Sequence, residues 1–163
     1  MIDVRGILYT DFMEYSLIEY DLDVELFLSL VWHDDLSSQS SHPFILSLPG
    51  RSLSDIIEEM IRVSGCNDSV GMFDAMGREI NSIRFEAYVK RNARFSREKM
   101  RRQRIWVHGK FGESINQIKT PLKIGNGHHR CLAYAAKVIL GELVYEPVSA
   151  LIRVPGRPWQ EVV

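Results

Sequence analysis

The sequence has few cysteines and no long apolar run. Cys66 and Cys131 are the two cysteines among 163 residues, and their positions form no disulfide pattern. This excludes a disulfide scaffold and favours a reducing compartment. The apolar runs stop short of the ~18 residues that a membrane helix needs, and the N-terminus lacks the basic start and apolar stretch of a signal peptide. We therefore expect a cytoplasmic protein with no membrane partner.

Several motifs of metal and enzyme chemistry are also missing. The sequence has no CxxC pair and no HExxH, GxxxxGK[ST] or GxSxG motif, so it lacks the usual signatures of zinc ribbons, zincins, P-loop enzymes and serine hydrolases. His33, His42 and His108 have no spacing typical of zinc ligands. We therefore predict no protein metal ligand. The hydrophobic share of 45% and the charged share of 25% are typical of a folded globular chain.

Opposite charges are concentrated in different parts of the chain. Residues 1–60 carry twelve acidic and two basic residues, whereas residues 84–110 carry ten basic and two acidic ones. Two interpretations remain open. The basic stretch binds nucleic acid, with Arg94, Arg97, Arg101 and Arg102 as the contacts and Phe95 and Trp106 as stacking residues. Alternatively, it pairs inside the fold, with Arg97, Arg101 and Arg102 against acids from residues 11–35.

Local patterns predict elements along the first two thirds of the chain. Ser52 and Gly65 have the positions of an N-cap and a C-terminal stop for a helix between them. A second helix is expected over residues 82–104. The other expectations are a strand or helix at 24–32, a polar loop at 33–43, a strand at 44–48, a weakly patterned stretch at 66–81, a strand at 104–108 and a turn at 109–112.

Residues 118–154 contain the clearest pattern. A short strand at 121–124 is followed by the turn Gly125-Asn126-Gly127, an amphipathic helix that Gly141 ends, and a strand at 148–154. A helix N-terminus beside glycines and Arg130 is a natural site for a phosphate or another anion. His128 and His129 can add hydrogen-bond donors or a proton-transfer group, or they cap and pack the helix start.

The run Asn126-Gly127-His128-His129-Arg130, followed by an Ala-rich helix, Gly141 and a strand, resembles the ParB/sulfiredoxin superfamily. The Asn-Gly-His-His-Arg form is common in phage-encoded ParB-like proteins. The resemblance implies an α+β fold with a small mixed sheet and packed helices over residues 44–163, and residues 1–43 as an acidic extension packed on that core. It also implies that Gly127, His128, His129 and Arg130 contact nucleotide phosphates, and we predict Asn126, Gly127 and Arg130 as the ligand-binding residues.

The function implied by this resemblance is nucleotide or phosphate binding by a phage-encoded protein in the host cytoplasm. The leading hypothesis adds phosphotransferase or nucleotide hydrolase activity, in which Mg2+ accompanies a nucleoside triphosphate and His128 or His129 is catalytic. The alternative is a catalytically inactive module that binds DNA or a protein partner, for example an inhibitor of host defence.

Departures from the family motifs favour this alternative. The Glu-Asn-x-x-Arg motif of the ParB clamps is missing, and Asn126 stands where the family often has Asp. Cys131 follows Arg130 instead of preceding it, so sulfinic-acid reduction is not expected.

Overall fold

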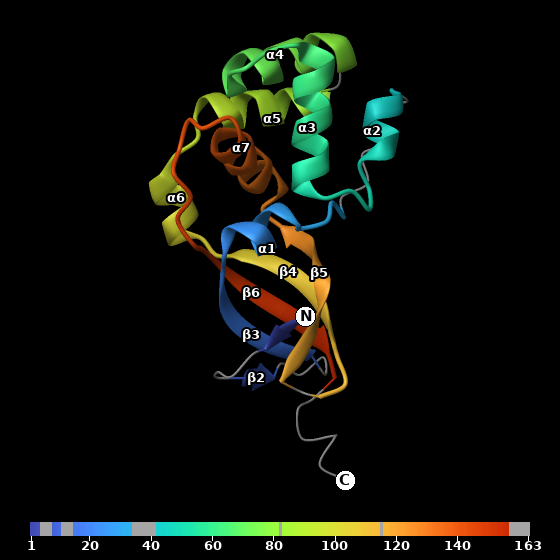
Figure 1. Cartoon of the computed structure of the whole chain (residues 1–163), viewed down its shortest axis with the longest axis vertical. Helices are drawn as coiled ribbons and strands as arrows, with labels where there is room; N and C mark the ends of the chain where they lie inside the picture. The colour runs from blue at the N-terminus through green and yellow to red at the C-terminus, as the bar shows by residue number, and fades with distance from the viewer. Residues whose placement is uncertain (4–7, 11–14, 34–41, 82, 115, 157–163) are drawn as a thin grey trace.

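Helices cover one end of a curled six-stranded sheet (Figure 1). This computed structural model describes residues 1–3, 8–10, 15–33, 42–81, 83–114 and 116–156. The predicted α+β class is confirmed. The predicted loop at 33–43 falls mostly outside the described residues.

The sheet has the strand order β1-β5-β4-β6-β3-β2. Strands β4 and β6 are parallel neighbours, and the other neighbouring strands are antiparallel. The parallel pair arises because β5 and α7 carry the chain from the end of β4 back to the start of β6. The strands are β1 (Ile2–Asp3), β2 (Leu8–Thr10), β3 (Tyr15–Leu22), β4 (Ile105–Phe111), β5 (Gln117–Asn126) and β6 (Val148–Pro155).

Strand β6 shows why one face of the sheet is core. Val148, Ala150, Ile152 and Val154 are buried, and the residues between them are half-buried on the other face. This alternation follows from the two-residue repeat of a strand. Strand β3 pairs with β6 along all eight of its residues, so part of the acidic N-terminal region lies inside the sheet.

The helices begin and end at local capping signals. Ser52 Oγ accepts a hydrogen bond from the Asp55 N–H at 3.1 Å, and Gly65 ends the helix with φ +66°, as the sequence predicts. The helices are α1 (Val24–Leu28), α2 (Pro43–Ser47), α3 (Leu53–Ser64), α4 (Ser69–Ile80), α5 (Ile83–Ala93), α6 (Arg97–Arg102) and α7 (His128–Ile139).

The predicted strand at 44–48 is wrong, because α2 occupies these residues. His42 Nδ1 accepts from the Phe44 N–H at 3.1 Å, and Pro43 stands at the first helical position, where its fixed φ suits a helix. The weakly patterned stretch at 66–81 contains α4. Asp68 caps it, and the Glu142 carboxylate accepts hydrogen bonds from the Ser69 N–H and hydroxyl, a contact that no local pattern reveals.

Two other predicted boundaries change. The single helix at 82–104 is two helices, α5 and α6, separated by Arg94-Phe95-Ser96, where the Phe95 ring stacks on Tyr134 with centroids 5.5 Å apart. The turn expected at 109–112 lies later, because β4 continues to Phe111 and the Gly112 N–H donates to the Gln117 carbonyl. The predicted strands at 104–108, 121–124 and 148–154 are confirmed within β4, β5 and β6.

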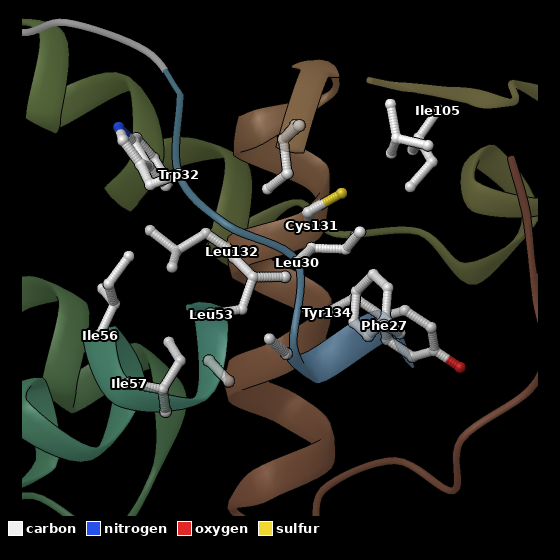
Figure 2. Close-up of a cluster of buried hydrophobic side chains, with 14 of the residues drawn as sticks. Phe27, Leu30, Trp32, Leu53, Ile56, Ile57, Ile105, Cys131, Leu132 and Tyr134 are labelled. Carbon is white, nitrogen blue, oxygen red and sulfur yellow. The ribbon is translucent and has the colours of Figure 1, made fainter. Parts of the chain in front are cut away.

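The segment after α1 joins the helices to the sheet. The Val31 N–H donates to the Leu122 carbonyl at 2.9 Å, and the Ile124 N–H donates to the Val31 carbonyl at 3.0 Å. Leu30 and Trp32, on either side of Val31, enter the core shown in Figure 2, which α3 and α7 also line. The start of α7 is therefore held between the sheet and the helices.

Candidate anion-binding site

The turn before α7 has the predicted strand-to-helix geometry. Asn126 ends β5, Gly127 has φ +100°, and His128 is the first helical residue. A Cβ on Gly127 would lie 3.0 Å from Ile105 Cγ2 and 3.1 Å from the Arg130 guanidinium. Glycine is therefore required both by the left-handed conformation and by the close packing.

The two histidines of this turn pack against aromatic rings. His128 lies edge-on to Trp32 with centroids 4.9 Å apart, and His129 stacks on Tyr88 at 4.0 Å. Trp32 and Tyr88 are each 1% exposed. These contacts tie the start of α7 to α5 and to the segment after α1. His128 and His129 are not among the described residues that line the cavity beside Arg130.

Arg130 has a fixed position in the first turn of α7. Its Nη1 donates to the Gln103 carbonyl oxygen at 2.7 Å, a backbone group just after α6. Burial lowers the pKa of Arg130, and repulsion from Arg91 on α5 lowers it further. The guanidinium nevertheless stays charged at neutral pH. An anion between Arg91 and Arg130 would relieve this repulsion.

A basic cavity lies beside Arg130, between α5, α6 and α7. Its volume is about 420 Å3. Phe95, Ser96 and two alanines form part of its wall, and no carboxylate lines it among the described residues. The cations of the basic cavity are Lys90, Arg91, Arg94, Lys99 and Arg130.

The neighbouring arginines have acidic partners instead. Arg97 and Arg101 both donate to the Glu146 carboxylate, at 2.9 and 2.8 Å. Arg102 pairs with Glu98 at 2.6 Å, one helical turn earlier. Within the described residues, these three arginines therefore pair with acids outside residues 11–35, contrary to the prediction. Arg104 does pair with such an acid, Glu19, at 2.6 Å.

The sequence-predicted contacts are thus divided between two environments. Of the four arginines predicted to bind nucleic acid, Arg94 lines the basic cavity, and Arg97, Arg101 and Arg102 are ion-paired. Lys90 was missed. A usable signal was present, because positions 87, 90, 91 and 94 have the spacing i, i+3, i+4, i+7 of one helix face.

The described residues do not offer a protein-held metal site here. No group of three His, Cys, Asp or Glu side chains gathers in the described part of the chain. The basic cavity in particular offers no carboxylate to Mg2+, so its residues do not fit a magnesium ion bound by the protein.

Cys131 is buried inside α7, and burial raises the pKa of its thiol to about 12. A thiol in this state is not a nucleophile at neutral pH.

Comparison with known proteins identifies no relative of this chain. The chain matches none of the protein-family models, curated proteins or solved structures with which it was compared. Within the described ranges, none of the helices is long and apolar enough to cross a bilayer. Functional interpretation therefore depends on the residues themselves.

Proposed function

We propose that this protein binds a nucleotide whose phosphates lie in the basic cavity. One observation carries the proposal: five cations from three helices and the segment between α5 and α6 surround a single cavity that no described carboxylate lines. Like charges held together in this way destabilise one another, so a polyanion that neutralises them gains more than it would at scattered surface cations.

The shape and chemistry of the cavity suit a compact ligand. Its volume of about 420 Å3 is within the range of small-molecule sites. Arg130, oriented by the Gln103 carbonyl, is positioned to offer a guanidinium edge to a phosphate. Phe95 with the neighbouring Ala87 and Ala133 supplies an apolar wall for the nucleoside.

The resemblance of Asn126–Arg130 to the ParB/sulfiredoxin loop supports the same assignment. It directs attention to the start of α7, and Arg130 is the residue of that motif that lines the basic cavity. The proposal contains no catalytic step, because the rings of His128 and His129 pack against Trp32 and Tyr88. It contains no step through magnesium either.

An extended DNA contact is less well supported. A duplex gains affinity from many phosphates contacted along a surface. Arg97, Arg101 and Arg102 would extend the basic cavity along α6, but Glu146 and Glu98 already neutralise them. The five cations of the basic cavity form no ion pair within the described residues and surround a compact space, which favours a small ligand.

Calorimetric titration with ATP, CTP and pyrophosphate tests the proposal. The informative variant is Arg91→Ala/Arg94→Ala, and its matched control is Arg101→Ala/Arg102→Ala, which removes two charges from α6. We expect nucleotide binding by the native protein and the control, and a loss of at least tenfold in the cavity variant. Binding should persist in EDTA, because protein cations neutralise the phosphates.

Two results would contradict the proposal. One is the absence of binding to all three ligands at millimolar concentration. The other is equal weakening by the cavity variant and the control, which would indicate a diffuse charge effect. Binding of duplex DNA in the absence of nucleotide, lost in the control variant, would support the alternative of a DNA-binding module.

A further inference from the structure

A second cationic cavity lies on the outer face of the sheet, away from the basic cavity between the helices. Its volume is about 440 Å3, and it is lined by residues of β3, β4, β5 and β6 together with His33. We call it the sheet-face cavity. Its cations are Lys110, Lys119, Lys123 and Arg153, and no carboxylate lines it among the described residues.

The register of the strands gathers these groups. His108 is paired with Lys123 on β5 and with Arg153 on β6, so the three side chains form a row across the sheet. The Arg153 guanidinium lies 3.9 Å from the centre of the Tyr15 ring, which orients it over this face. Three neighbouring strands thus present positive or titratable groups in one line.

A histidine pair lies within the sheet-face cavity. The His33 and His108 rings have centroids 5.8 Å apart. A Cβ at Gly125 would lie 2.6 Å from His108 Nε2, so the glycine makes room for the imidazole. Burial lowers the pKa of His108, and repulsion from His33, Arg153 and Lys123 lowers it further. A bound anion would favour the protonated form of His108.

An aromatic ring extends the same face. Trp106 is two residues before His108 on β4, so both point away from the core, and Trp106 is 40% exposed. An exposed indole beside a row of cations combines the two elements used for single-stranded nucleic acid: charge for the backbone and a ring for a base.

We propose that the sheet-face cavity binds the phosphodiester backbone of a single-stranded oligonucleotide, with a base stacked on Trp106. The inference is independent of nucleotide binding between the helices, because the two cavities share no lining residue. Single strands suit this face better than a duplex, whose bases are not free to stack on an indole.

Fluorescence anisotropy with a labelled oligothymidylate of twelve nucleotides tests this site. The variant Lys119→Ala/Lys123→Ala removes two cations from the sheet-face cavity. The control Arg62→Ala/Arg78→Ala removes two charges from α3 and α4. We expect Lys119→Ala/Lys123→Ala to bind the oligonucleotide at least tenfold more weakly than the native protein, and the control to differ from it less than twofold. If all four cations contact phosphates, native affinity should fall about 50-fold between 50 and 200 mM salt.

Trp106 supplies a second readout. Trp106→Ala should weaken binding about five- to hundredfold, and Trp106→Phe should retain part of the affinity because a ring remains. The native protein should also show fluorescence quenching on binding that Trp106→Phe lacks. Inorganic phosphate serves as the competing small ligand, and we expect it to displace the oligonucleotide only at far higher concentration.

The pH dependence tests the histidine pair. The oligonucleotide phosphates keep their charge between pH 8 and pH 6, so a tighter complex at pH 6 that depends on His108 reports proton uptake by this ring. The gain should be at most about tenfold if the pKa of His108 rises by one unit on binding, since the full factor is reached only below both pKa values. His108→Ala should remove this gain and leave the weaker binding that the native protein shows at pH 8.

Three outcomes would overturn the inference. The first is an equal loss of oligonucleotide affinity in Lys119→Ala/Lys123→Ala and in its control. The second is full affinity in Trp106→Ala, and the third is loss of oligonucleotide binding in Arg91→Ala/Arg94→Ala. The last result would place the oligonucleotide in the basic cavity between the helices. Failure of nucleotide binding with intact oligonucleotide binding would contradict the proposed function alone.

Discussion

Cations from one stretch of sequence have two different environments in this protein. Lys90, Arg91, Arg94 and Lys99 line the basic cavity and form no ion pair within the described residues, whereas Arg97 and Arg101 share the Glu146 carboxylate. The paired arginines already have their counterion and connect α6 to the loop before β6. The cavity cations have no counterion in the described part of the chain.

This difference separates charge with a structural role from the charge that we propose binds a ligand. A paired arginine stabilises the fold and has little left to offer a phosphate, while an unpaired group of like charges costs free energy until an anion arrives. Substitutions in the two groups should therefore have opposite consequences. Cavity substitutions should change binding with little loss of stability, and substitutions around Glu146 should do the reverse.

The largest effect on binding is expected from Arg130→Ala. A charge-assisted hydrogen bond to phosphate contributes ~1.5–3 kcal/mol, which corresponds to about ten- to a hundredfold in nucleotide affinity. Arg130→Lys should rescue only part of this loss, because the planar two-donor geometry is missing. Calorimetry measures both, with thermal unfolding as the check that the bond to the Gln103 carbonyl is not essential to the fold. Native affinity in Arg130→Ala would show that this arginine does not bind the ligand.

Single exposed cations of the basic cavity should have smaller effects. Arg91→Gln and Lys99→Gln should each weaken nucleotide binding about two- to fivefold, because an exposed charge interaction contributes up to ~1 kcal/mol. Arg101→Gln is the matched control on α6 and should leave the affinity unchanged. If Arg101→Gln weakens nucleotide binding as much as Arg91→Gln does, the paired cations and the cavity cations do not differ in their effect on binding.

Glu146→Gln should affect stability first and binding second. The hydrogen bond from Arg101, and then the charge of Arg97, lower the pKa of Glu146 below its ordinary value of 4.5. A depressed pKa in the folded state means that the carboxylate stabilises the fold above this ordinary value and loses this contribution as the pH falls further. The native protein should therefore lose more stability than Glu146→Gln between pH 5 and pH 3 in urea unfolding.

The same variant sharpens the comparison at neutral pH. Glu146→Gln leaves Arg97 and Arg101 without their carboxylate, beside the cavity that Lys99 of the same helix lines. Nucleotide affinity should rise slightly while the melting temperature falls. A fall in both affinity and melting temperature would mean that the ion pairs of Glu146 maintain the shape of the basic cavity. The paired cations and the cavity cations would then not have separate roles.

The sequence predicts the local elements well and the pairing of charges poorly. The turn at Gly127, the helix after it and the cap at Ser52 follow from signals within a few residues. The partner of Arg97 and Arg101 lies 49 and 45 residues away, so no periodicity indicates which arginines it neutralises. Helix α4 was missed although Asp68 caps it locally, and the second partner of its first turn, Glu142, lies 73 residues away. The sequence predicts Arg130 as a phosphate ligand because a glycine turn and the start of a helix lie directly before it.

His129 should contribute to the fold more than to binding. Its ring stacks on the buried Tyr88, and an aromatic pair of this kind contributes ~0.5–1.5 kcal/mol beyond its buried area. His129→Ala should lower the free energy of unfolding by about 1–2 kcal/mol and change nucleotide affinity less than twofold. His129→Phe should recover most of the stability. If a phosphate-release assay detects hydrolysis and His129→Phe abolishes it, the histidine has the catalytic role that the family resemblance implies.

The smallest effect on binding is expected at Cys131. This thiol lies among core side chains between α7 and β4 (Figure 2), and its position one residue after Arg130 does not bring it to the basic cavity. Cys131→Ser should leave nucleotide affinity unchanged and lower stability by about 1–3 kcal/mol, because a hydroxyl replaces the thiol in an apolar site. In the native protein a thiol reagent should label the half-buried Cys66 quickly and Cys131 only on unfolding. If Cys131 is instead labelled rapidly and bound nucleotide prevents this labelling, its sulfur lies at the ligand. Cys131 would then belong to the cavity and not to the core.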